Sequence, residues 1–290
     1  DVVATASGWI ALLQAPDPAL KSHALGKLLG CVDTLWHEVA ECLPDLEALA
    51  EDLDLPLAMR QTAAAVASRV FFHLDERQQA LRLALEAGET HFDLQKGRQT
   101  PYVESLTRAA LDAYVTERRK LRGDDDTDKP GDDNGKEEIG IPLEQLQGLV
   151  YRLLDACCDE GRYDHALGIT LEAQETQKLK DILSKAPRSE ITALLKYALD
   201  LSISVVSSKS FRQEALTIVA ECLAGQVEHR RMASVDLVLV YQLLHEPQSV
   251  ANVLGRLLNA TEEEALLGFQ LCFDLVDSGD QAFVTRVAEV

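Results

Sequence analysis

Apolar residues recur at intervals of three and four along nearly the whole of this 290-residue sequence. A typical stripe consists of Ala63, Ala67, Val70 and Leu74. Because an α-helix makes one turn in 3.6 residues, side chains at this spacing share one face of a helix. The one strand-like run, residues 203–208, continues a helical stripe, so we expect helix there as well. The pattern therefore predicts an all-α protein.

Prolines and candidate N-cap residues interrupt these stripes every 15 to 20 residues or so, the spacing of helices joined by short turns. Ser210, Asp75 and Thr261 are candidate N-caps, and Glu264 follows Thr261 at the distance that a capping box requires. We therefore expect about fourteen helices packed as antiparallel pairs. Near the C-terminal end, one helical stripe joins Ala265, Phe269, Cys272 and Val276.

Two segments of the chain are alike, residues 80–87 (ALRLALEA) and residues 166–173 (ALGITLEA). Small alanines with neighbouring leucines allow two helices to cross closely, as in tetratricopeptide hairpins. Because the period is irregular, we predict a degenerate α-solenoid, a rod of stacked antiparallel helical hairpins that forms one domain over residues 1–290. An ordinary helical bundle with a chance similarity is the alternative.

An acidic segment, residues 123–139, breaks the helical pattern, since it contains eight acids, three glycines and a proline. We expect a disordered surface loop within the domain, because the segment has almost no apolar side chain to pack. A calcium-binding interpretation is weaker. Pro130 falls where a ligand belongs, and Asp133 falls where an apolar residue is usual. The residues that match an EF-hand loop are Asp126, Asp128, Gly131, Asp132, Asn134 and Glu137.

The net charge restricts the classes of partner. The chain carries 48 acidic and 28 Lys or Arg residues, which gives a formal charge of −20. Such a surface repels nucleic acid and anionic membranes, so we expect protein partners. The basic cluster Arg118, Arg119, Lys120 and Arg122 is the local exception. It closes a helix, and we interpret it as compensation of the helix dipole rather than as a phosphate site.

The six cysteines are scattered along the chain on apolar helix faces and form no CxxC pair, which predicts reduced thiols and an intracellular protein. No apolar run reaches the length of about 20 residues that a membrane span needs, and the first residues do not form an export signal. For Cys157 and Cys158, which are adjacent, we expect one buried and one exposed thiol, because neighbouring helical residues point about 100° apart.

The sequence offers no constellation for chemistry. None of the seven histidines has a second histidine three to five residues away, as a zinc site would need. The motifs of acyl transfer, phosphoryl transfer and dinucleotide binding are absent as well. We therefore predict no catalytic, cofactor-binding or metal-binding residues, no cofactor and no enzymatic activity.

Several unrelated segments, taken together and in order, resemble one family. The chain looks like the N-terminal region of non-ATPase regulatory subunit 1, the largest scaffold of the 26S proteasome regulatory particle. The resemblance covers nearly all 290 residues. The segments that carry it are LKSHALGKLL (20–29), AAAVASRVFFHL (63–74), GRYDHALGITLEA (161–173), SFRQEALTIVAECL (210–223), EPQSVANVLGRLL (246–258) and FQLCFDLVDSGDQAF (269–283).

This resemblance implies a helical rod that precedes a ring of proteasome/cyclosome repeats. The whole subunit would bridge the ATPase base and the lid of the cap, and take part in recognising ubiquitinated substrates in the cytoplasm and nucleus. The Gly-rich repeats of the ring and the C-terminal segment that docks a ubiquitin receptor are absent from this chain. The acidic segment 123–139 does not follow the family pattern. The family brings no catalytic residue.

The leading hypothesis is a scaffold arm of the proteasome cap, and two other functions are alternatives to it. A free-standing adaptor would bind a client peptide in a groove lined by Asn, Lys and Arg, and the sequence shows no such cluster. An enzyme is the third hypothesis, and no motif supports it.

Overall fold

The computed structural model describes residues 6–92, 100–123, 141–226 and 233–290. Within these ranges it contains fifteen α-helices, one short 3₁₀ helix and no β-strand. The predicted all-α class is therefore confirmed. Residues 203–208 are helical only to Ser204, where α10 ends. Among the described helices, none has both the length and the apolar character that a membrane span requires.

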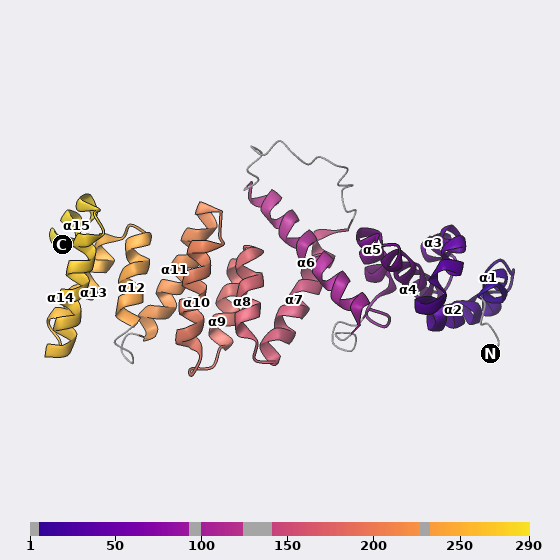
Figure 1. Cartoon of the computed structure of the whole chain (residues 1–290), viewed down its shortest axis with the longest axis horizontal. Helices are drawn as coiled ribbons and strands as arrows, with labels where there is room; N and C mark the ends of the chain where they lie inside the picture. Colours follow the sequence, from indigo (N-terminus) through magenta and orange to yellow (C-terminus); the bar gives the residue numbers. More distant parts are fainter. Residues whose placement is uncertain (1–5, 93–99, 124–140, 227–232) are drawn as a thin grey trace. The chain divides into compact units, whose positions relative to one another are not determined.

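The chain forms two compact units, and the division between them falls within α6 (Pro101–Arg122) and α7 (Leu143–Asp159). The first unit takes residues 1–117 and 126–153, and the second takes residues 118–125 and 154–290. Figure 1 labels the helices along the chain. Before α6 the elements are α1 (Ser7–Leu13), α2 (Pro18–Val39), η1 (Ala40–Cys42), α3 (Leu43–Glu51), α4 (Leu57–His73) and α5 (Arg77–Ala87).

The helix α4 is the centre of the first unit and packs against α2, α3 and α5. Four of its alanines, Ala63, Ala64, Ala65 and Ala67, are almost completely buried. A helix that neighbours surround needs small side chains on several faces, because its partners approach from more than one direction. The alanine-rich sequence of α4 thus explains its central position.

The second unit is a row of helices in which each contacts its sequence neighbours and, at several places, the next helix but one (Figure 1). These longer-range pairs are α8 with α10, α9 with α11, α10 with α12 and α13 with α15. Contacts of this kind are typical of an α-solenoid, and the predicted class is confirmed. The helices are α8 (Tyr163–Glu172), α9 (Thr176–Lys185), α10 (Ile191–Ser204), α11 (Lys209–Gln226), α12 (Ala233–Leu243), α13 (Pro247–Leu258), α14 (Glu262–Asp277) and α15 (Gln281–Ala288).

One corner motif recurs between α4 and α5, α7 and α8, α8 and α9, and α12 and α13. One residue takes a left-handed backbone conformation, and the N–H of the next residue donates to the carbonyl five residues earlier at 2.8–3.0 Å. This Schellman arrangement satisfies the last carbonyls of one helix and starts the next helix within two residues. The left-handed residues are Asp75 (φ 63°), Gly161 (φ 75°), Gln174 (φ 57°) and His245 (φ 57°).

The two similar segments occupy equivalent places after this corner. Residues 80–87 begin at the fourth position of α5, and residues 166–173 begin at the fourth position of α8. Ala80 and Ala166 are both fully buried. The sequence similarity therefore corresponds to a structural repeat, in which a small residue lies where the second helix of a hairpin meets its neighbours.

The predicted helix starts are confirmed in part. Thr261 caps α14 and forms the expected capping box with Glu264. The other two predicted caps are wrong. Ser210 lies inside α11, and the hydroxyl of Ser208 accepts the N–H of Phe211 instead. Asp75 is the left-handed residue of its corner, a position that asparagine and aspartate tolerate better than most residues.

Candidate interaction surfaces

The basic end of α6, which itself belongs to the second unit, forms ion pairs with acidic side chains of that unit. Arg118 Nε lies 3.0 Å from Glu175 Oε1, and Arg119 Nη2 lies 3.6 Å from Glu172 Oε1. Arg118 and Glu175 are largely buried, with side chains 22% and 7% exposed, so this pair is held away from bulk water. The basic cluster therefore does more than compensate the helix dipole, because its arginines join the end of α6 to α8 and the turn after it.

Arg122 completes this cluster at α11. Its Nη2 lies 3.4 Å from Glu214 Oε2, and its guanidinium stands 5.0 Å from the ring centre of Phe211. The Thr176 hydroxyl donates to the same carboxylate oxygen at 2.7 Å. The hydrogen bond from Thr176, with the help of Arg122, holds the pKa of Glu214 below its ordinary value. The three arginines of the cluster thus each pair with an acid of this chain.

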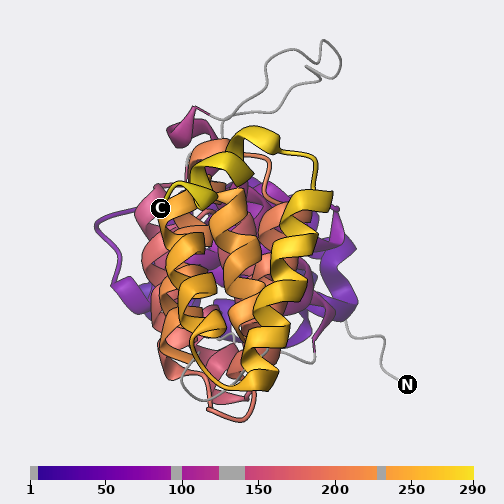
Figure 2. The same cartoon turned by 90° about the vertical axis from the view of Figure 1, so that its left-hand side faces the viewer.

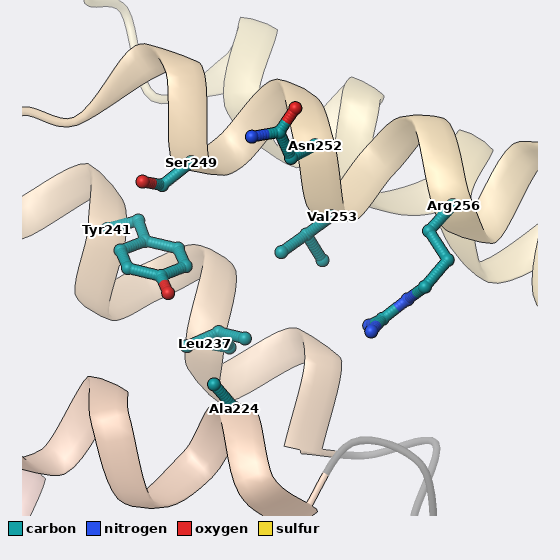
Figure 3. A pocket seen from close by; sticks show the side chains of 7 residues that line it. All are labelled: Ala224, Leu237, Tyr241, Ser249, Asn252, Val253 and Arg256. Carbon is teal, nitrogen blue, oxygen red and sulfur yellow. The ribbon is translucent and has the colours of Figure 1, made fainter.

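A hollow of about 220 Å³ opens between α11, α12 and α13 (Figure 3). Burial, and then the charge of Glu246, raises the pKa of Tyr241 in this hollow. Ser249 donates its hydroxyl proton to Glu246 at 2.8 Å. Small-molecule pockets measure roughly 300–1,000 Å³, so this hollow has room for one side chain of a partner. Its lining consists of Ala224, Leu237, Tyr241, Ser249, Asn252, Val253 and Arg256.

The sequence did not reveal this group of polar residues. Asn252 and Arg256 are four residues apart on α13, and Tyr241 comes from α12. The spacing of four places Asn252 and Arg256 on one face of a helix. The sequence could therefore have indicated that Asn252 and Arg256 share a face. It could not have indicated that α11 and α12 pack on that side of α13.

The outer face of α14 carries exposed apolar side chains. Leu266, Phe269, Phe273 and Val276 are 62%, 55%, 67% and 56% exposed. The predicted stripe of Ala265, Phe269, Cys272 and Val276 is therefore not the face that packs. The face of α14 toward α13 instead buries Gly268, Leu271 and Leu275. The helix is apolar on two sides, and the spacing alone did not show which side packs.

The adjacent cysteines differ from the prediction, because Cys157 and Cys158 are both buried, at 4% and 6% exposure. Leu154 and Ala156 are buried as well, so the last turns of α7 are covered around much of their circumference. The Arg162 guanidinium donates to Cys157 Sγ at 3.8 Å, and burial raises the pKa of the Cys158 thiol. A raised pKa keeps a thiol protonated and unreactive at neutral pH.

In the part of the chain that the structure describes, no three His, Cys, Asp or Glu side chains gather as a metal site would need. The candidate calcium residues, from Asp126 to Glu137, lie outside the described residues, as does nearly all of the acidic segment 123–139.

Together, the consecutive hairpins, the recurrent corner and the small side chains at helix crossings define an α-solenoid of the degenerate tetratricopeptide kind. A family model described as the N-terminal domain of 26S proteasome subunit RPN2 matches residues 4–290. The chain belongs to this family.

Relatives from distant organisms support the same assignment. A 26S proteasome non-ATPase regulatory subunit 1 homolog of Arabidopsis thaliana is 33% identical over 99% of this chain and 27% of its own length. The Drosophila melanogaster 26S proteasome non-ATPase regulatory subunit 1 is 32% identical over 98% of this chain and 26% of its own length. The 26S proteasome regulatory subunit rpn2 of Schizosaccharomyces pombe is 28% identical, and the match covers 28% of it. The chain thus spans about a quarter of the length of these relatives.

Proposed function

We propose that this chain is the N-terminal helical arm of a scaffold subunit in the regulatory particle of the 26S proteasome. It would support the assembly of base and lid for ubiquitin-dependent protein degradation, without catalysis of its own, in the cytoplasm and nucleus. The observation that carries the proposal is the family match over residues 4–290, which runs through both helical units. The names of the relatives, non-ATPase regulatory subunits, support a role without ATPase chemistry.

The proposed mechanism is geometric. The hairpins of each unit bury small residues where helices cross, such as Ala63 in α4 and Ala166 in α8. Packing of this kind makes a stiff body, because protein interiors have the density of organic crystals. Stiff helical ridges then present extended surfaces to neighbouring subunits. The partners would be proteins of the lid and base, in agreement with the acidic charge of the chain.

The experiment that tests this proposal compares two tryptophan substitutions in the tagged full-length protein. Ala166 is completely buried in α8, which contacts α9 and α10, so Ala166→Trp overfills the hairpin at a cost of about 3 kcal/mol. Ala58→Trp makes the same chemical change at an exposed position of α4. We expect Ala166→Trp to lower the yield of lid and base subunits that co-purify, and Ala58→Trp to leave it unchanged.

Circular dichroism and amide exchange establish that Ala166→Trp disturbs the hairpin locally while the chain stays helical. If the α8 hairpin is loosened and the lid and base subunits still co-purify in full amount, the scaffold role of this chain is wrong. Failure of the wild-type protein to retain any proteasome subunit would contradict the proposal more broadly.

The hollow formed by α11, α12 and α13 gives the adaptor hypothesis one specific observation, because Asn252 and Arg256 lie together there. Amide and guanidinium groups are the donors that bind peptide carboxylates. At about 220 Å³, however, the hollow accommodates one side chain rather than a peptide segment. If Arg256→Ala removed a bound client and left proteasome subunits in place, the adaptor function would be favoured.

A further inference from the structure

The helix α14 has two apolar faces, and the described residues cover only one of them. The packed face holds Gly268, Leu271 and Leu275. At Gly268 the helix comes so close to α13 that a Cβ atom would lie 3.1 Å from the Leu258 side chain. The opposite face is the exposed stripe of Leu266, Phe269, Phe273 and Val276, which we name the α14 stripe.

The α14 stripe is one continuous surface. At 100° per residue, its four side chains fall within an arc of about 80°. All four are more than half exposed, and two are phenylalanines. A helix that is apolar on opposite sides is typical of a buried position between two neighbours. Clustered apolar exposure of this kind marks a surface that another element covers.

The neighbouring helix α15 does not cover the stripe. Its main contact is with α13. Phe283 of α15 is fully buried, and the centre of its ring lies 6.3 Å from that of His245, in the corner before α13. Figure 2 shows α13, α14 and α15 together at the end of the second unit, in yellow. The buried side chain of α15, Phe283, thus belongs to its contact with α13, and the α14 stripe stays exposed, so one further helix can pack on it.

The contact pattern of the second unit indicates which element belongs there. Extensive contacts to the next helix but one occur in four of the six such pairs from α8 to α15, namely α8 with α10, α9 with α11, α10 with α12 and α13 with α15. Where this pattern continues, the partner of α14 is the first helix after α15. Relatives in this family are about four times as long as the chain, and the family match continues to residue 290. A protein of the length of these relatives has enough chain after residue 290 to supply that helix.

We propose that the α14 stripe is an intramolecular docking surface for the first helix that follows α15 in the full-length protein. The occupant is an amphipathic helix whose apolar stripe packs on Phe269 and Phe273. This contact would continue the solenoid from the described helices into the remaining three quarters of the subunit. It does not depend on the proposed role in the proteasome, since it can form in a protein that never enters the regulatory particle.

The test is site-specific photo-cross-linking in the full-length protein. p-Benzoyl-phenylalanine replaces Phe273, an exchange of one exposed aromatic side chain for another that leaves α14 intact. The matched control places the same photoreactive residue at Asp274, which is exposed one position away, about 100° around the helix. After irradiation, mass spectrometry identifies the residues joined to each position.

We expect the Phe273 position to cross-link within the same chain, to a segment that begins shortly after residue 290. The Asp274 position is expected to give little of this product. Cross-links from Phe273 to a second copy or to a different protein would overturn the proposal. So would a yield no higher than that of the control, or a natural protein that ends at Val290.

Amide exchange provides a second readout that needs no substitution. Peptides from α14 should exchange about tenfold more slowly in the full-length protein than in the 290-residue chain, because a helix covered on two faces opens less often. Peptides from α4, which is already surrounded, serve as the internal control. Equal exchange of α14 in the two proteins would contradict a covered stripe.

Discussion

Replacing Ser68 with alanine should destabilise the first unit by about 1–3 kcal/mol, because it breaks a hydrogen-bond chain that joins three helices. The Ser68 hydroxyl, in α4, donates to the carbonyl of Ala80 in α5 at 2.5 Å. It also lies 2.7 Å from the Tyr102 hydroxyl of α6. Since the Ser68 proton is committed to Ala80, the Tyr102 hydroxyl is the donor to Ser68.

The magnitude follows from burial. Ser68 is 0% exposed and Tyr102 is 7% exposed, so water cannot replace the lost partner. Burial raises the pKa of Tyr102 to about 12, so its hydroxyl keeps the proton that it donates to Ser68. Ser68→Ala leaves the buried Tyr102 hydroxyl without its acceptor and costs up to about 3 kcal/mol. Tyr102→Phe keeps the bond from Ser68 to Ala80, so it should cost only about 1 kcal/mol.

The assay is urea unfolding of the chain followed by tryptophan fluorescence. The two tryptophans, Trp9 and Trp36, both lie in the first unit, so their fluorescence reports on that unit even if the two units unfold separately. The double variant Ser68→Ala/Tyr102→Phe should cost less than the sum of the single variants, because neither hydroxyl is then left alone. Strict additivity, or a Ser68→Ala protein as stable as the wild type, would refute the hydrogen-bond chain.

Two further predictions concern the second unit. Thr261→Ala removes the half of the capping box in which the Thr261 hydroxyl accepts the N–H of Glu264, and it should reduce the stability of α14 by about 1 kcal/mol. The loss is measured as faster amide exchange in the first turns of α14, and unchanged exchange would contradict the cap. Glu214→Gln should remove a pH-dependent stabilisation. The pKa of Glu214 is held below its ordinary value of 4.5, so its contribution is present above pH 4.5 and is lost as the pH falls through the lower, folded pKa. Because Glu214 is 46% exposed, we expect an effect below about 1 kcal/mol, seen as a smaller loss of stability on acidification than in the wild type.

The sequence predicted the features that depend on neighbouring residues. Helical periodicity identified the class, and Thr261 was found because a capping box lies within four residues of chain. The similarity of residues 80–87 and 166–173 identified true structural equivalents, since both segments follow the same corner. Local rules of this kind depend only on the chain near a residue.

The features that the sequence missed depend on residues far apart in the chain. Three of the four Schellman corners place Asp75, Gln174 or His245 in the left-handed conformation, where glycine would have been the recognisable signal. The partner of Arg122 is Glu214, 92 residues away, and no periodicity indicates that pairing. The exposed side of α14 could not be identified for the same reason, because both of its faces have apolar spacing.

The most direct test of the proposed function is a cryo-electron-microscopy reconstruction of the regulatory particle purified through this protein. We predict density for the helices α1 to α15 in the assembled particle, in contact with other subunits along their outer ridges. The second unit should show the α14 stripe covered by the helix that follows α15. A regulatory particle that assembles completely without density for these helices would contradict the account.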